Sequence, residues 1–174
     1  CDWSSDVCSS DLDDVFEQVE FFVDAVSDYK SDFVLFPEYF NAPLMAKFNH
    51  LGEAQSIRGL AQYTEEVRDR FINLAISYNI NIITGSMPYV KEDGGLYNVG
   101  FLVRRDGSYE MYEKVHVTPD EIKSWGLSGG KMVQTFDTDC AKIGILICYD
   151  VEFPELSRIM ADQGMQILFV PFLT

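Results

Sequence analysis

Three side chains with complementary reactivity lie at the ends of short apolar or alternating segments. Glu38 follows DFVLF, Lys114 ends SYEMYEK and Cys148 ends KIGILIC. A thiol attacks a carbonyl or nitrile carbon as the thiolate, so it needs a nearby base or positive charge. A carboxylate can take that proton and later pass it to a leaving amine. An ammonium can offset the negative charge that develops on the substrate oxygen.

The positions of the three residues suggest where they would meet. Functional side chains of α/β sheets gather beyond the carboxyl ends of strands, and each of these residues ends or follows a predicted strand. The strand that Lys114 ends belongs to a predicted antiparallel hairpin, so convergence on one pocket is a hypothesis at this stage. Free N–H groups in the turn after Cys148, such as that of Tyr149, could add to an oxyanion site.

Each residue also has a simpler interpretation when it is taken alone. Cys148 fits a small buried hydrophobic residue, Glu38 an exposed loop acid and Lys114 a solvated strand end. His116 is conceivable as the base for Cys148, but its spacing does not require this, and a packing role fits it better. Cys140, in DTDCAK, is interpreted as a structural thiol in a turn.

Periodicity predicts the elements that would position these residues. A helix after Asp13 has one apolar face. A second helix is predicted with Thr64 as its N-cap, and a third opens at Pro154 and closes at Gly164. The apolar residues expected to face the core from the first two helices are Val15, Phe16, Val19, Phe22, Val23 and Val26, then Val67, Phe71, Leu74, Ala75 and Tyr78.

Strands alternate with these helices along the chain. Asp106-Gly107 is a strong hairpin turn signal, and the stretch up to about Ser56 has no clear period. The predicted strands are 32–36, 81–86, 96–104, 108–114, 142–148 and 166–172. This order predicts an α/β fold with layers around a mixed sheet.

The first twelve residues, CDWSSDVCSSDL, fit none of these patterns. They have no period of 2 or 3.6, so residues 1–12, with Cys1 and Cys8, are interpreted as a non-native or disordered leader. Residues 13–174 are then predicted to be one partial domain that is truncated at both ends.

Composition narrows the possible partners. The 174 residues carry a net charge of −15, which argues against nucleic acid because phosphate binding needs clustered Lys and Arg. No apolar run approaches the roughly 20 residues that span a bilayer, and no export signal is recognised, so a cytoplasmic location is expected. The four cysteines form no C-x-x-C pair and no Cys/His cluster, so no zinc site is expected.

Three local patterns resemble the signature segments of the nitrilase superfamily. They are FPEYF around Glu38, YEKVHVTPDE around Lys114 and GILICYDVEFPE around Cys148, and they occur in the family's order. The resemblance covers the chain from about residue 13 onward. It implies an α-β-β-α sandwich that assembles as a homo-oligomer, with Glu38 as base, Lys114 as oxyanion stabiliser and Cys148 as nucleophile. It also suggests Glu121 as a second glutamate, although an acid at a helix start is an equal alternative.

The resemblance further implies hydrolysis of a non-peptide C–N bond in a small amide, through a cysteine thioester and without a metal or organic cofactor. Nitrile hydrolysis, acyl transfer by the same three residues, and a catalytically inert fragment remain alternatives. By the same resemblance, Asp150 is expected to order the turn after Cys148. Glu152 stands where many relatives have Arg, which favours amine-bearing substrates over carboxylate-bearing ones. The stretch from YEKVHVTPDE to WGLSGG is most similar to bacterial members that follow an acetyltransferase domain, which this chain does not contain.

Overall fold

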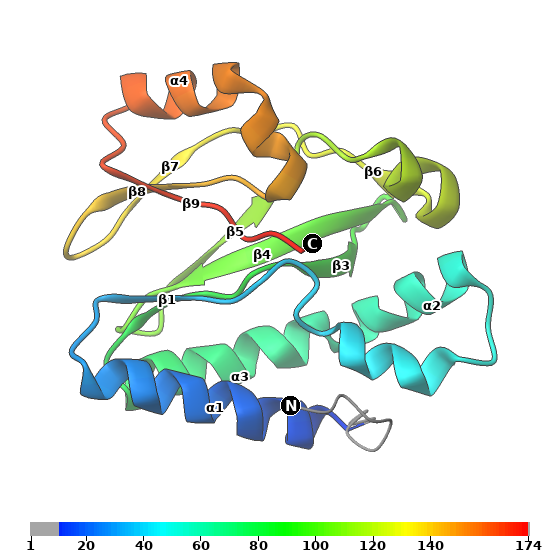
Figure 1. The fold of residues 1–174 in the computed structure, drawn as a ribbon, viewed down its shortest axis with the longest axis horizontal. Coiled ribbons are helices and arrows are strands. Elements are labelled where there is room, and N and C mark those ends of the chain that lie inside the picture. The colour runs from blue at the N-terminus through cyan, green and yellow to red at the C-terminus, as the bar shows by residue number, and fades with distance from the viewer. Residues whose placement is uncertain (1–10, 174) are drawn as a thin grey trace.

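The computed structural model describes residues 11–173 as four stacked layers (Figure 1). Two helices cover one face of a six-stranded sheet, and a three-stranded sheet packs on its other face with a further helix outside it. The helices are α1 (Leu12–Asp28), α2 (Glu53–Leu60), α3 (Thr64–Ser77) and α4 (Pro154–Asp162). The strands are β1 (Phe33–Leu35), β2 (Asn81–Ile83), β3 (Met87–Val90), β4 (Leu96–Val103), β5 (Tyr109–Glu113), β6 (Leu127–Ser128), β7 (Thr135–Asp137), β8 (Lys142–Ile145) and β9 (Ile167–Phe169). Short helical turns span Ala42–Phe48, Ala61–Tyr63, Glu121–Trp125 and Cys148–Glu152.

The long strand β4 organises the larger sheet. Strands β2 and β3 pair in succession along one side of β4, and β5 and β6 pair along the other. Strand β1 lies parallel to β2 at the edge. A Cβ atom at Gly100 of β4 would lie 2.1 Å from the carbonyl oxygen of Gly85, so the chain approaches itself here in a way that only glycine permits.

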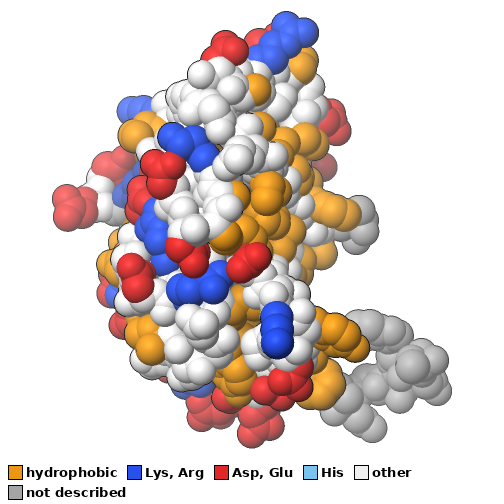
Figure 2. All heavy atoms as spheres, turned by 90° about the vertical axis from the view of Figure 1, so that its left-hand side faces the viewer, with side chains coloured by type: hydrophobic (Ala, Val, Ile, Leu, Met, Phe, Trp, Pro, Cys, Tyr) orange, Lys and Arg blue, Asp and Glu red, His pale blue; other side chains and the backbone are white. Residues whose placement is uncertain are grey.

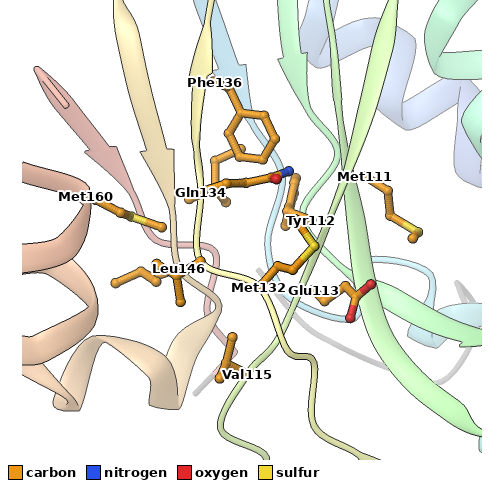
Figure 3. A pocket seen from close by; sticks show the side chains of 11 residues that line it. Met111, Tyr112, Glu113, Val115, Met132, Gln134, Phe136, Leu146 and Met160 are labelled. Atoms are coloured by element: carbon orange, nitrogen blue, oxygen red, sulfur yellow. The ribbon is translucent and has the colours of Figure 1, made fainter. Parts of the chain in front are cut away.

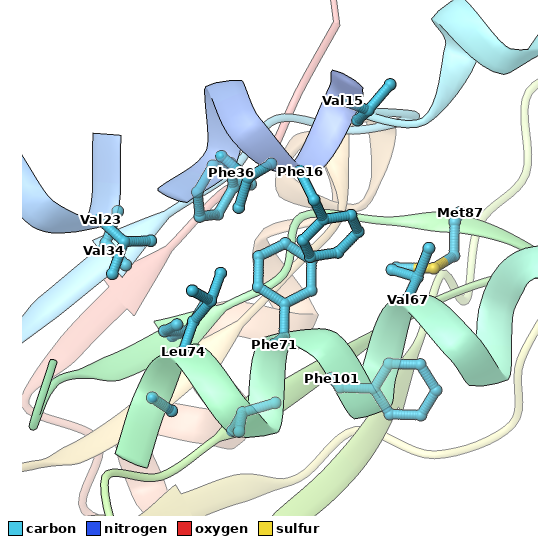
Figure 4. Close-up of a cluster of buried hydrophobic side chains, with 14 of the residues drawn as sticks. Val15, Phe16, Val23, Val34, Phe36, Val67, Phe71, Leu74, Met87 and Phe101 are labelled. Atoms are coloured by element: carbon cyan, nitrogen blue, oxygen red, sulfur yellow. The ribbon is translucent and has the colours of Figure 1, made fainter. Parts of the chain in front are cut away.

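Apolar clusters separate the layers. The cluster between α1, α3 and the larger sheet centres on Phe16, Phe36 and Phe71, whose ring centroids lie 5.2 Å apart in two of the three pairs (Figure 4). Burying one such ring contributes roughly 1.5–3 kcal/mol. A second cluster, between the two sheets, comprises Ile83, Leu102, Tyr112, Phe136, Ile143, Ile145 and Ile147. A third lies beneath α4 and includes Leu146, Leu156 and Met160.

The first predicted helix is confirmed as α1, with one error on its apolar face. Phe22 is 55% exposed, whereas Val19 and Val23 are buried. Successive side chains of a helix are turned by about 100°, and this places Phe22 at the edge of the buried face of α1, where it points toward solvent. Leu12, in the predicted leader, opens α1 and is buried, and Asp11 caps the helix. Residues 1–10, with Cys1 and Cys8, lie outside the described residues, and the division at residue 12 stays a prediction.

The other elements confirm most of the pattern and correct parts of it. Helix α2 and strands β3, β6 and β7 were not predicted, and α2 lies in the stretch with no clear period. Thr64 is the first residue of α3 and not its N-cap, because its backbone is already helical, with a φ of −61° and a ψ of −38°, and Tyr63 takes the cap position. The Thr64 hydroxyl donates to the carbonyl of Pro88 at 2.6 Å. The hairpin is confirmed as β4–β5. Pro154 begins α4, and Gly164 follows its end with a φ of 88°.

Charged side chains of opposite sign lie next to one another on the face shown in Figure 2. Among the ion pairs of the molecule, Arg105 contacts Asp32 and Asp139, each at 3.1 Å. Within residues 11–173, no helix has the length and apolar character needed to cross a membrane.

Candidate active site

The fold brings a carboxylate, an ammonium and a thiol from three separate segments to one place. Glu38 follows β1 and Lys114 follows β5, both of the larger sheet, whereas Cys148 lies three residues beyond β8 of the smaller sheet. The Nζ atom of Lys114 lies 2.8 Å from Oε1 of Glu38. The charges of Glu38 and Lys114 both act on the Cys148 thiol, which lies near them. The structure therefore brings the three side chains together, and their catalytic roles stay predictions.

Lys114 sits between two buried carboxylates. Glu121 accepts from Nζ of Lys114 with both oxygens at 2.9 Å, so it lies opposite Glu38. The exposed fractions of Glu38, Lys114 and Glu121 are 3%, 2% and 4%. Glu121 does begin a short helical turn, as the simpler interpretation of this residue expected, but its side chain points inward. The residue suggested by the resemblance therefore lies in this cluster, and its role in the reaction stays a prediction.

Opposing effects set the charges of this cluster. Burial alone would lower the pKa of Lys114, but the hydrogen bonds and charges of Glu38 and Glu121 outweigh it and raise the pKa. Burial would raise the pKa of Glu121, yet Lys114 and the backbone N–H of Thr118, which donates at 2.7 Å, leave it below its ordinary value. Lys114 is therefore held as an ammonium and Glu121 as a carboxylate.

Cys148 lies in a tight turn with an unusual backbone. Its φ of 46° is left-handed, which side chains other than Gly, Asn and Asp rarely adopt. Its N–H donates to the carbonyl of Pro171 at 2.9 Å. Burial first, and then the hydrogen bond and negative charge of Glu38, raise the pKa of the thiol, with Lys114 opposing them. The resting side chain is consequently a thiol, with the Glu38 carboxylate near it.

Two neighbours of the carboxylates were missed in the sequence. Asn98 of β4 is fully buried and donates from Nδ2 to Oε1 of Glu38 at 3.0 Å. The Tyr39 hydroxyl donates to Oε1 of Glu121 at 2.7 Å. Burial, followed by the charge of Glu121, raises the pKa of the Tyr39 phenol, so it stays a donor. An amide in an otherwise apolar strand was the available signal for Asn98.

Asp150 orders the turn after Cys148, as expected. The carboxylate is fully buried and accepts backbone N–H groups of Val115, His116 and Ile147 at 3.1, 2.6 and 3.4 Å. Burial raises the pKa of Asp150, and these N–H groups act against that effect. The His116 ring lies 3.1 Å from the Asp150 carboxylate and stacks on Phe153 at 3.7 Å, which is a packing role and not a bond to Cys148.

The two residues suggested for substrate binding lie in the turn Cys148–Glu152. Tyr149 is partly exposed, and its ring meets that of Phe153 edge-on at 5.2 Å. Glu152 is exposed at the end of the turn. Cys140 is exposed in the turn between β7 and β8, and Asn81 contacts its sulfur. Roles for Tyr149 and Glu152 in substrate binding stay predictions.

A separate hollow of about 180 Å³ lies near this cluster (Figure 3). Its walls include Met111, Met132 and Met160, and none of Glu38, Lys114 and Cys148 lines it. Among the described residues, no group of three or more His, Cys, Asp or Glu side chains is arranged to hold a metal ion.

Comparison with known proteins places this geometry in a family. The sequence model described as carbon–nitrogen hydrolase matches residues 4–174. The chain belongs to the carbon–nitrogen hydrolase family. Yeast Nit3, a member of branch 10 of the nitrilase superfamily, superposes with a TM-score of 0.78 at 24% identity, over 92% of this chain and 59% of that one. The α-β-β-α sandwich of the nitrilase superfamily is thereby confirmed.

Two relatives are more similar to this chain in sequence. The Bacillus subtilis protein named probable hydrolase YhcX is 50% identical over 157 residues, which are 90% of this chain and 30% of that protein. Human omega-amidase NIT2 is 34% identical over 151 residues, which are 79% of this chain and 50% of that protein. The chain therefore spans half or less of the length of these relatives.

Proposed function

We propose that the protein hydrolyses a small amide, with Cys148 as nucleophile, Glu38 as general base, Lys114 as oxyanion stabiliser and Glu121 as the residue that holds Lys114. One observation carries the proposal: a buried ammonium lies 2.8 and 2.9 Å from two buried carboxylates, with a thiol near enough to feel the charges of Glu38 and Lys114. Burying three charges is costly and stabilises the fold little, if at all. Such a cluster is therefore better explained by chemistry than by stability.

In the first half of the reaction, Glu38 takes the thiol proton as the Cys148 sulfur attacks the amide carbon. The raised pKa of Cys148 means that little thiolate exists beforehand, so proton transfer accompanies attack. Protonation removes the charge of Glu38 and weakens its bond to Lys114. One N–H of the ammonium then becomes available to the developing oxyanion, while Glu121 keeps the ammonium in place.

The second half returns the site to its starting state. Glu38 passes its proton to the leaving nitrogen, the C–N bond breaks, and ammonia or an amine departs from the thioester. Water then attacks the thioester carbon while Glu38 takes a water proton. The C–S bond breaks, and that proton returns to the Cys148 sulfur. Asn98 fixes one oxygen of Glu38 at 3.0 Å, which keeps the other oriented for these transfers.

Amides are favoured over nitriles as substrates because a relative that is 34% identical bears the name omega-amidase. The proposed thioester would form from either class, and an added amine could replace water in the second half. The substrate panel should therefore contain simple amides, the terminal amides of dicarboxylic acids and the matching nitriles, each with and without hydroxylamine.

The experiment measures ammonia release by the intact protein and by its Cys148→Ala variant, with Cys140→Ala as the matched control. We expect turnover to fall about 10⁴-fold or more in Cys148→Ala and to stay unchanged in Cys140→Ala. Ammonia release that survives in Cys148→Ala would refute the proposal. Hydroxamate formation would report the thioester in either case, whereas a failure to form free acid until an amine or alcohol acceptor is added would assign the protein to the acyl-transfer alternative.

Thiol labelling separates a catalytic from an inert chain without knowledge of the substrate. Iodoacetamide resembles a small amide, and Glu38 can deprotonate Cys148 during attack, so Cys148 should react faster than the exposed Cys140. Mass spectrometry of the peptides that contain the two cysteines measures both labelling rates. Equal and slow labelling of Cys148 and Cys140 would favour the inert alternative.

A further inference from the structure

The nucleophile and the ammonium belong to different sheets, which no strand pairing joins. Lys114 follows β5 in one layer, and Cys148 follows β8 in the next (Figure 1). Apolar contacts between the layers fix their spacing but are not directional, and the polar contacts of Arg104 and Arg105 with Asp137 and Asp139 lie at the opposite end of β8 from Cys148. Acyl chemistry needs the sulfur and the ammonium to be placed relative to one carbonyl group, where an error of 1 Å costs about a hundredfold in rate. A directional link across the layers is therefore needed.

Asp150 makes such a link. Its Oδ2 accepts the N–H of Val115, the residue after Lys114, and the N–H of Ile147, the residue before Cys148. Its Oδ1 accepts the backbone N–H of His116 at 2.6 Å and faces Nδ1 of the same residue at 3.1 Å. One fully buried side chain thus bonds to the peptides next to both reactive groups.

We propose that Asp150 is a positioning residue that sets the Cys148 sulfur relative to the Lys114 ammonium across the two sheets. This inference rests on the proposed function. A carboxylate is required because both oxygens accept N–H groups, and asparagine would turn an NH₂ group against two of these donors. The Asp150 side chain does not reach the substrate in this role; it acts through the backbone of the two segments.

The stack of His116 on Phe153 is a second contact between the two segments that Asp150 joins. The rings are nearly parallel, with an interplanar angle of 9°, and Phe153 immediately precedes α4. His116 belongs to the segment after Lys114, and Phe153 to the segment after Cys148. The polar link through Asp150 and this aromatic contact therefore join the same two segments.

The test compares Asp150→Asn and Asp150→Glu with Asp106→Asn, in the intact protein. Asp106 also accepts a backbone N–H, that of Ser108 at 2.8 Å, but lies exposed in the β4–β5 turn, at the opposite end of β5 from Lys114. We expect kcat per folded molecule to fall about 10- to 100-fold in both Asp150 variants, with KM changed less than about threefold. Asp106→Asn should leave both constants unchanged. Iodoacetamide labelling of Cys148 should slow in parallel with kcat.

The outcomes separate this inference from the proposed function. If Cys148→Ala is inactive but both Asp150 variants retain the wild-type kcat per folded molecule, the positioning role is wrong and the proposed function stands. A loss of activity that matches the loss of folded protein, measured by circular dichroism and urea unfolding, would also overturn it. Should Asp150→Asn fail to fold, Asp150→Glu decides, because it keeps the charge and displaces the carboxylate by one methylene.

Discussion

Two buried regions of this molecule are built in opposite ways. Beneath α1, aromatic rings and aliphatic side chains pack around Phe71, and each contact adds to stability. Around Lys114, three charged groups are withdrawn from water, and their attraction must first offset the loss of hydration. The first region is organised for stability and the second for reactivity, and both are anchored on the same sheet.

The largest expected effect comes from breaking the charged cluster at its centre. Lys114→Met should lower turnover about a thousandfold and lower the free energy of unfolding by about 3–5 kcal/mol, because two buried carboxylates lose their counter-charge. Ammonia release and urea unfolding measure the two effects.

The triple variant Glu38→Met, Lys114→Met, Glu121→Met is the control for that experiment. It should be inactive, yet at least as stable as the wild type, since apolar replacements of buried ion clusters are often neutral or stabilising. A triple variant less stable than Lys114→Met would show that the cluster does stabilise the fold.

Phe71→Ala probes the apolar region in the same way. We expect the free energy of unfolding to fall by about 3–5 kcal/mol, because the ring is fully buried against Phe16 and Phe36. Activity per folded molecule should stay unchanged. A tenfold loss of that activity would mean that the two regions are coupled through the sheet.

Glu38→Gln tests how the charge of Glu38 affects the pKa of the Cys148 thiol in the charged region. Glu38 raises the pKa of the Cys148 thiol through its hydrogen bond and charge, so its removal should lower that pKa and increase the thiolate fraction at a given pH. Thiolate absorbance near 240 nm, titrated against pH, measures the shift. Turnover should nevertheless be lost, because no base remains. A thiol pKa that rises in this variant would contradict the arrangement.

The smallest effect is expected at Glu152, which is exposed at the end of the turn after Cys148. Glu152→Arg should shift the preference between succinamate and β-alaninamide toward succinamate by about two- to fivefold, as is typical of an exposed charge pair. Ratios of kcat/KM for the two amides measure this shift. An unchanged ranking would mean that Glu152 does not face the substrate.

Sequence reasoning located the groups with local signals and missed those that depend on distant partners. Glu38, Lys114 and Cys148 each lie in a recognisable segment at the end of an element. The bonds from Asn98 to Glu38 and from Tyr39 to Glu121 join residues 60 and 82 positions apart, which no local pattern encodes.

The same distinction explains the errors in secondary structure. Strand β3 contains Pro88, which argues against a central strand, but β3 pairs only with β4, and an edge position tolerates the missing N–H. Thr64 looked like a helix cap because its hydroxyl can serve the backbone locally. In the structure the helix begins one residue earlier than that pattern predicts, with Tyr63 as the N-cap, and the Thr64 hydroxyl donates to the distant carbonyl of Pro88.

The left-handed backbone at Cys148 has a consequence for any work that replaces this residue. A side chain in this conformation costs roughly 1–2 kcal/mol, a cost that alanine or serine at the same position would inherit and glycine would not. Replacing alanine by glycine normally lowers the free energy of unfolding. At position 148, glycine should instead give a higher free energy of unfolding than alanine. The difference in free energy of unfolding between Cys148→Gly and Cys148→Ala would measure the backbone strain that the fold stores at the position of the sulfur atom.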